Sequence, residues 1–283
     1  MDDTRTSFML TLKRMEAEHY TLHEGEQIQD ILTLMLRYIG DPDPDLRDEL
    51  IYPAFYAWIN DETTLSAAEL RSLLTVLLDD QHLFFQIGSD GDPSVFTRAF
   101  SSLPIALIVR RHWQKPFLVQ ADFQYLKDSL LRYYQEEKDL RGYLPEGGWA
   151  HAAAHGADAL VELVQCPESD NSVLLEILAA IKGMLHNGHH IFQDEEDERI
   201  ASIVDTMIEK RLLPQQIIAE WTSSLAVCAS WPKSRSQVIA RVNSKNFLRC
   251  LYFRREQDGH ENALASAMLA AETALNKFAI RAS

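Results

Sequence analysis

Hydrophobic side chains recur three and four residues apart along almost the whole chain, as at Phe8, Leu12 and Met15. A longer stripe of the same kind runs from Ile28 to Ile39. This spacing is typical of helices that bury one face, and the alternation typical of strands is missing. The pattern therefore predicts an all-α protein without a sheet.

The same spacing predicts about twelve helices, most of them joined by short connections. Ser66 and Glu69 mark the clearest helix start, because a serine followed three residues later by a glutamate forms a capping box. Pro53 is expected to kink the third helix, and Pro104 to bend or break the fifth. The expected spans are 4–19, 25–39, 43–59, 66–81, 93–112, 119–138, 149–165, 171–187, 194–211, 214–230, 234–255 and 261–281.

The organisation of these helices favours one body. No Gly/Ser-rich or Pro-rich linker divides the chain, which predicts a single continuous all-helical domain over residues 1–283. Amphipathic helices in series favour stacked antiparallel pairs, as in a HEAT- or armadillo-like α-solenoid. The segment Gly40 to Asp48 is typical of a HEAT repeat entry, where Asp-Pro turns cap a helix and Arg47 reaches neighbouring carboxylates. The internal repeat is weak, so an irregular helical bundle is the alternative.

Composition and charge limit the classes of function. The 283 residues include 27 Lys and Arg against 42 Asp and Glu, a formal net charge of −15. An anionic surface repels phosphate groups, so general nucleic-acid binding is not expected. No apolar run approaches the roughly 20 residues that cross a bilayer, and the start lacks the features of a signal peptide. Three widely spaced cysteines are typical of buried thiols. We expect a soluble cytoplasmic protein without membrane insertion.

One expected helix, 149–165, carries residues that could support chemistry. His151, His155 and Asp158 are spaced four and three apart and would share a face. Two histidines at this spacing can bind one divalent metal, with Asp158 as a third ligand or as the acceptor that orients an imidazole. A purely structural role in the core is the alternative, since neither HExxH nor a His-Asp dipeptide is present. The remaining residues are mostly Ala and Gly, which leave room for a neighbouring helix or for a ligand.

Two charged clusters extend this candidate site. Acidic residues at 194–198 suit the positive end of a helix dipole, and those at 136–139 suit a solvated helix end. In a stack of helix pairs, however, helices 149–165 and 194–211 would lie parallel in one layer, with the loop 139–148 opening at the same end. Trp149 borders the histidine face, although a tryptophan is also explained as a packing anchor. The candidate site residues are Asp139, Arg141, Trp149, His151, His155, Asp158, Glu195, Glu196 and Arg199.

Several of these segments together resemble a known family. They are 139–142 (Asp-Leu-Arg-Gly), 148–151 (Gly-Trp-Ala-His), 154–158 (Ala-His-Gly-Ala-Asp), 194–199 and the Asp-Pro segment 41–48. They resemble a bacterial family called domain of unknown function 2785, over nearly the whole chain. The resemblance implies a helical soluble protein and supports one functional region made of 139–158 and 195–199. It supplies no reaction.

Two functions are compatible with these features. The first is a binding or scaffold protein whose partner is a protein or a small-molecule ligand, because no complete catalytic motif is present. The second is a metal-dependent hydrolase or lyase that uses the face of His151, His155 and Asp158, with a divalent metal as its cofactor.

The role of Asp158 is testable. A carboxylate on a buried face needs a partner, and His155, Arg199 or a bound cation could supply it. With His155 or Arg199 as the partner, Asp158→Ala should destabilise the fold by roughly 3–5 kcal/mol if the pair is buried. With a metal as the partner, the variant should mainly lose metal and keep its apo stability. Thermal melts with and without chelator separate the two, and parental melting in both conditions would contradict both.

Overall fold

The computed structural model describes residues 3–255 and 263–278. Helices dominate, and the strands among these residues are limited to one short hairpin, so the expected all-α class is confirmed and the expected absence of any strand is not. The chain forms two compact units, Met1–Cys166 and Pro167–Ser283. The single continuous domain stays a prediction. Part of the expected helix 261–281 lies outside the described residues.

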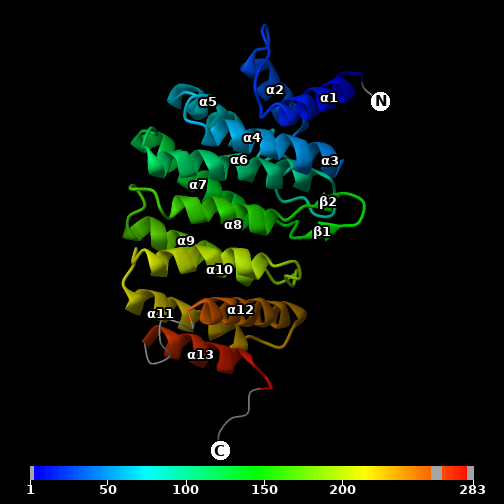
Figure 1. Ribbon diagram of the computed structural model, residues 1–283. Helices are drawn as coiled ribbons and strands as arrows, with labels where there is room; N and C mark the ends of the chain where they lie inside the picture. The colour runs from blue at the N-terminus through cyan, green and yellow to red at the C-terminus, as the bar shows by residue number, and fades with distance from the viewer. Residues whose placement is uncertain (1–2, 256–262, 279–283) are drawn as a thin grey trace, which may run out of the picture. The chain divides into compact units, whose positions relative to one another are not determined.

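The first unit is a layered arrangement of helices. Figure 1 shows α4, α6 and α8 side by side in chain order, so alternate helices share a layer within this unit. That order is what stacked helix pairs require, whereas a HEAT-like solenoid stays a prediction. The elements are α1 (Asp3–Ala17), α2 (Ile28–Tyr38), α3 (Pro44–Leu46), a π-helical turn (Arg47–Ile51), α4 (Tyr52–Asn60), α5 (Ala67–Leu77), α6 (Ser94–Gln114), α7 (Gln120–Glu136), β1 (Tyr143–Leu144), β2 (Gly148–Trp149) and α8 (Ala152–Leu163).

Helix α6 is central to the core of this unit. It packs against α4, α5 and α8 and buries nearly every side chain from Ser94 to Val109. A helix surrounded in this way needs no polar face. Arg98 is nevertheless fully buried in it, because its guanidinium forms an ion pair with buried Glu137 at 2.6 Å. Pro104 lies inside α6, and the helix continues through it without the expected break.

Pro53 is accommodated by the π-helical turn that precedes it. In a regular α-helix its ring would meet the carbonyl of residue 49, and it has no N–H to donate. Across Arg47–Ile51 the helix widens, and the N–H of Tyr52 donates to the carbonyl of Arg47, five residues back. The turn therefore adds one residue to the helix at the point where the Asp-Pro segment enters it.

The Asp-Pro segment forms its cap as expected, but its arginine does not act as expected. Asp43 accepts the N–H of Asp45 at 3.0 Å and so caps α3. The side chain of Arg47 donates to backbone carbonyls instead of carboxylates. The guanidinium of Arg5, from α1, pairs with Asp41 and Asp43 in its place, at 2.7 and 3.0 Å.

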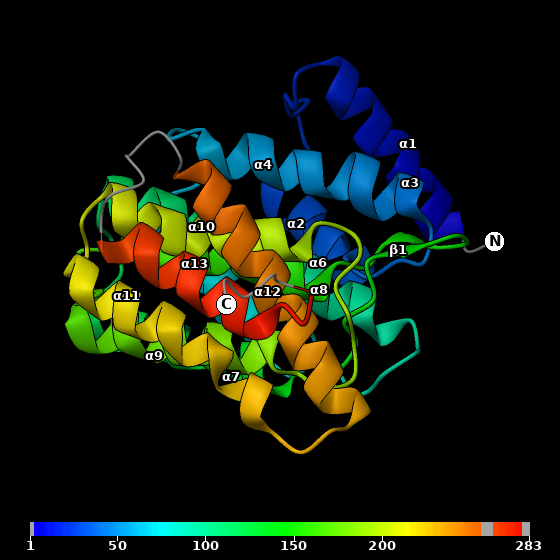
Figure 2. The same cartoon turned by 90° about the horizontal axis from the view of Figure 1, so that it is seen from below.

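The second unit contains helices that pack around α12. In Figures 1 and 2, α11, α12 and α13 lie together, and α12 also packs against α10. Among the described residues, no helix combines the length and apolarity that a membrane crossing requires. The elements are α9 (Asn171–Leu185), α10 (Glu196–Glu209), α11 (Gln215–Ser224), a 3-10 turn (Leu225–Ser230), α12 (Arg235–Arg254) and α13 (Ala263–Leu275).

Two glycines give a matched stability test. A Cβ at Gly40 would lie 2.0 Å from Oγ1 and 2.7 Å from Cα of Thr97, whereas a Cβ at Gly183, inside α9, would meet nothing within 4 Å. Gly40→Ala should therefore lower the free energy of unfolding by about 2 kcal/mol. Gly183→Ala should raise it by about 0.5–1 kcal/mol, since alanine is the better helix former. Urea unfolding followed by circular dichroism measures both, and equal effects of the two substitutions would contradict the packing.

Candidate functional site

The hairpin is the first element of the candidate site. β1 and β2 pair antiparallel, with Tyr143 opposite Trp149. Gly148 has a φ of +69°, which a glycine adopts without strain. A Cβ at Gly147 would lie 2.5 Å from the ring of Phe96 on α6. The consecutive glycines therefore let the hairpin turn tightly while it lies against the helical core.

The hairpin corrects the expected start of the next helix. The span 149–165 was expected to be helical, but α8 begins at Ala152, and Trp149 belongs to β2. His151 is the N-cap residue, with a φ of +53° and a ψ of +32°, in the left-handed region. Its N–H continues the hairpin pairing by donating to the carbonyl of Arg141 at 3.1 Å. A non-glycine residue held in this region stores strain, a feature that is concentrated at functional sites.

Arg47 anchors the hairpin. Its side chain is fully buried and donates to the carbonyl of Asp41 at 2.6 Å and to that of Gly147 at 2.5 Å. The guanidinium carbon lies 4.0 and 4.6 Å from the ring centroids of Phe96 and Phe100. Burial lowers the pKa of Arg47 to about 10, so the side chain remains charged at neutral pH. This charge is held by backbone carbonyls and aromatic faces.

Three aromatic rings line up from the hairpin into α8. Trp149 stacks on His151 with ring centroids 4.4 Å apart, and His151 meets His155 edge-on at 5.8 Å. His155 in turn packs edge-on against Phe100 at 5.2 Å. Both imidazoles are buried, whereas Trp149 is 38% exposed. The two histidines are therefore neighbours, but His151 precedes the helix, so they do not meet on the shared helical face that their spacing predicted. Trp149 is therefore a partly exposed surface residue that also packs against His151.

Asp48 is a residue of this site that the sequence analysis missed. It lies half-buried in the π-helical turn, where burial raises the pKa of its carboxyl while Arg47 and His151 favour its charged form. Its position in the Asp-Pro segment suggested only a helix cap. Pro53 predicted a kink in the helix but not a π-helical turn. The position of Asp48 depends on the extra residue of that turn, so the sequence pattern did not reveal it.

The small residues of α8 accommodate a neighbouring helix. A Cβ at Gly156 would lie 3.0 Å from ring atoms of both Tyr133 and Tyr134 of α7. The hydroxyl groups of these tyrosines donate to the carbonyls of Ala152 and Ala153, at 3.3 and 3.2 Å. Close approach of α7 therefore accounts for Gly156.

Asp158 lies one turn beyond His155 on α8 and is half-buried rather than fully buried. Solvent screening at a half-buried carboxylate reduces the loss expected from Asp158→Ala below the range for a fully buried pair.

Asp139 and Arg141 form a structural ion pair before the hairpin. Asp139 is fully buried, accepts Arg141 Nε at 2.7 Å and accepts the N–H of Gly91 at 3.0 Å. Glu137, also buried, accepts the backbone N–H groups of residues 138 and 139. The expected solvated helix end therefore applies to Glu136 alone, because the carboxylates of Glu137 and Asp139 are buried.

The remaining candidates belong to the second unit, at the start of α10. Glu195 is exposed and has a φ of +67°, and Arg199 is exposed. Glu196 is fully buried and accepts the N–H groups of Gln193 and Asp194, at 3.2 and 2.9 Å. This arrangement agrees with a helix-start role for Glu196. The convergence of these residues with His151, His155 and Asp158 stays a prediction.

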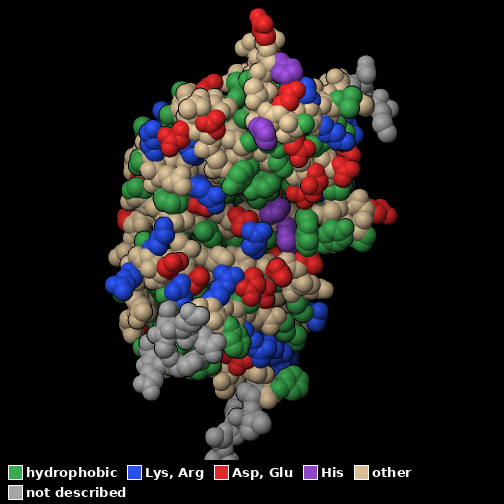
Figure 3. All heavy atoms as spheres, in the orientation of Figure 1, with side chains coloured by type: hydrophobic (Ala, Val, Ile, Leu, Met, Phe, Trp, Pro, Cys, Tyr) green, Lys and Arg blue, Asp and Glu red, His purple; other side chains and the backbone are tan. Residues whose placement is uncertain are grey.

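The surface of the hairpin is aromatic with acidic neighbours. Tyr143 is 53% exposed and packs edge-on against Trp149 at 5.0 Å. Figure 3 shows histidine side chains beside a row of hydrophobic side chains at the hairpin, with acidic side chains close by. Asp45, Glu49 and Glu146 are exposed on the adjoining turns. The arrangement can stack on a planar or apolar group and attract a cationic one.

The sequence matches the family described as a protein of unknown function, DUF2785, over residues 83–253. The chain therefore belongs to this family. The matched range includes the hairpin, α8 and the start of α10, but not the Asp-Pro segment 41–48, which also carried the resemblance. The bacterial origin stays a prediction. No curated protein and no solved structure matched the chain.

Replacing Arg47 should loosen the hairpin selectively. Arg47→Lys keeps the charge but loses the planar group that reaches two carbonyls and stacks on two rings. Amide hydrogen exchange of Ala150, whose N–H donates to the carbonyl of Gly142 at 2.9 Å, should accelerate about tenfold or more. The control is Arg71→Lys, which changes a solvent-exposed pair with Asp122. Unchanged exchange at Ala150 in Arg47→Lys would contradict the anchoring role.

Proposed function

We propose that this is a binding protein whose recognition surface is the β1–β2 hairpin together with the start of α8, and that its partner is another protein. The observation that carries the proposal is the aromatic array of Tyr143, Trp149 and His151, with successive ring centroids 5.0 and 4.4 Å apart, in which Tyr143 and Trp149 are exposed and His151 supports them from below the surface. Large aromatic side chains on a fixed backbone are the residues that contribute most to protein–protein affinity.

The rigidity of this surface supports recognition. The backbone of the hairpin is tied to α6 through Arg47, and His151 is held in the left-handed region between the hairpin and α8. A rigid surface loses little conformational entropy when it binds. Arg141, half-exposed beside Tyr143, adds a third residue type that is enriched in binding hot spots.

The charge of this region indicates the chemistry of the partner. Asp45, Asp48 and Glu49 lie on the turn that touches the hairpin, where a Cβ at Gly148 would be 3.0 Å from Cβ of Pro44. A surface of opposite charge accelerates association and selects against other acidic proteins. The partner that fits is therefore a basic surface that presents an apolar or planar side chain to Trp149.

Substitution of Trp149 tests this function. The full chain is immobilised, and proteins retained from an extract of its source cells are quantified by mass spectrometry. We expect a basic protein that the parent retains and that Trp149→Ala retains at least about tenfold less, as for a hot-spot residue. Tyr143→Ala should act in the same direction.

The matched control is Tyr56→Ala, which removes an aromatic side chain that is 49% exposed on α4. It should retain the same protein as the parent does. The interaction of the purified pair should also weaken with salt. Equal retention by the parent, Trp149→Ala and Tyr143→Ala would overturn the proposal.

A metal-dependent hydrolase or lyase is the second candidate. The observation that favours it is the proximity of two imidazoles, with ring centroids 5.8 Å apart, one at the N-cap of α8 and one in the helix, which also carries Asp158. Imidazole and carboxylate groups would suit a divalent ion such as zinc. Elemental analysis of the purified protein, together with the chelator melts of Asp158→Ala, tests this candidate. A metal content that His155→Ala does not lower would contradict it.

A further inference from the structure

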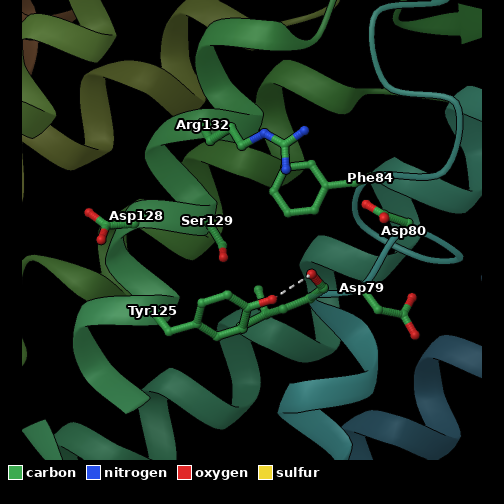
Figure 4. Close-up of a pocket in the computed structure, with 8 residues that line it drawn as sticks. Asp79, Asp80, Phe84, Tyr125, Asp128, Ser129 and Arg132 are labelled. Atoms are coloured by element: carbon green, nitrogen blue, oxygen red, sulfur yellow. Dashed lines mark hydrogen bonds between the residues drawn. The ribbon is translucent and has the colours of Figure 1, made fainter. Parts of the chain in front are cut away.

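A surface cavity of about 340 Å³ lies in the first unit, between α7 and the turn that follows α5. Figure 4 shows the rings of Phe84 and Tyr125 on opposite sides of it, with Ser129 on one flank. Asp79 and Asp80 lie on the other flank. This cavity shares no residue with the hairpin surface. It is therefore a separate candidate for ligand binding.

Ser129 is the residue that points to a ligand. Its side chain lines the cavity although the residue is only 4% exposed, and within residues 3–255 and 263–278 its hydroxyl makes no hydrogen bond but stays accessible from the cavity. Serine and threonine in helices commonly donate to the carbonyl four residues back. Ser72 and Thr75 of α5 do so, at 3.0 Å each. The Ser129 hydroxyl opens into the cavity instead, where water or the polar group of a ligand can supply its partner.

The charge around the cavity is negative. Asp80 is exposed and makes no hydrogen bond or ion pair with the described part of the chain. Asp79 accepts His82 Nδ1 at 2.8 Å. The one guanidinium nearby, that of Arg132, lies 4.1 Å from the ring centroid of Phe84 and pairs with Glu136 at 3.1 Å. Its charge is therefore already balanced, and the cavity attracts a cation.

The walls of the cavity select an organic cation over a metal ion. Hard metal ions require several oxygen ligands around them, whereas the ring faces of Phe84 and Tyr125 supply none. The face of Phe84 is already covered by the guanidinium of Arg132, whereas the ring of Tyr125 can attract an ammonium group and cover methylene groups. The Tyr125 hydroxyl donates to the carbonyl of Leu78 at 3.4 Å, and this carbonyl keeps a second lone pair for a donor.

We propose that this cavity binds a small aliphatic amine in its ammonium form. The carboxylate of Asp80 balances its charge, the Ser129 hydroxyl and the Leu78 carbonyl accept its N–H groups, and the methylene chain lies along the ring of Tyr125. The class of ligand follows from the combination of a carboxylate without a partner, a buried acceptor and aromatic walls. It does not depend on the function proposed for the hairpin.

Isothermal titration of the full chain with putrescine tests the proposal. Saturable binding with a Kd of about 1 mM or tighter is expected, given the size of the ligand. Asp80→Asn should weaken binding about tenfold or more, because it removes a charge-assisted contact. Ser129→Ala should weaken it severalfold, and 1,4-butanediol, the uncharged analogue, should not bind.

Asp128→Asn is the matched control. It removes the same charge from the same rim, but the carboxylate is directed away from the cavity and accepts Gln124 Nε2 at 2.9 Å and Lys127 Nζ at 2.8 Å (Figure 4). Binding should be unchanged in this variant. Equal weakening in Asp80→Asn and Asp128→Asn would show general charge attraction and overturn the proposal. Absence of binding to the parent chain, or unaltered binding in Ser129→Ala, would overturn it as well.

Discussion

The buried guanidinium of Arg47 is the interaction on which the candidate surface depends. Removing this charge from water is costly, and the cost is offset by the carbonyls of Asp41 and Gly147 and by the rings of Phe96 and Phe100. One side chain thus connects the Asp-Pro turn, the central helix α6 and the hairpin, which are far apart in the sequence. The hairpin has only two paired residues in each strand and would be marginal alone. Its orientation therefore follows from burial of the arginine.

Two departures from regular backbone occur around this arginine. The π-helical turn that contains Arg47 carries Asp48, and the left-handed residue His151 lies at the start of α8. Each is less favourable than a regular helix, and each is retained because the surrounding packing fixes it. The two sites also interact electrostatically, since His151 favours the charged form of the Asp48 carboxyl. Irregular backbone thus accompanies the polar side chains that the proposed recognition surface would use, which agrees with the place of strain in functional sites.

Local patterns in the sequence were sufficient to predict the helices. They were insufficient to predict the hairpin and the contacts between distant residues. Periodicity located α2, and the pair of Ser66 and Glu69 located the start of α5, because the information lies within one turn of helix. The hairpin was missed because strands of two residues show no alternation. The burial of Asp139 was missed because its acceptor bond to Gly91 joins residues 48 positions apart. The spacing of His151 and His155 predicted one shared helical face, whereas the contacts of His151 with both His155 and Trp149 depend on a φ angle that spacing does not report.

The π-helical turn also constrains how the length of this chain can vary. It contains one residue more than a regular helix of the same rise, and each residue of a helix turns the chain by about 100°. A deletion after Arg47 within this turn would restore a regular helix only by rotating the preceding segment, which would carry the guanidinium of Arg47 away from the carbonyl of Gly147. Restoring the regular helix would also bring the carbonyl of residue 49 against the ring of Pro53. The proline therefore depends on the additional residue, so that a relative without this residue should also lack the proline.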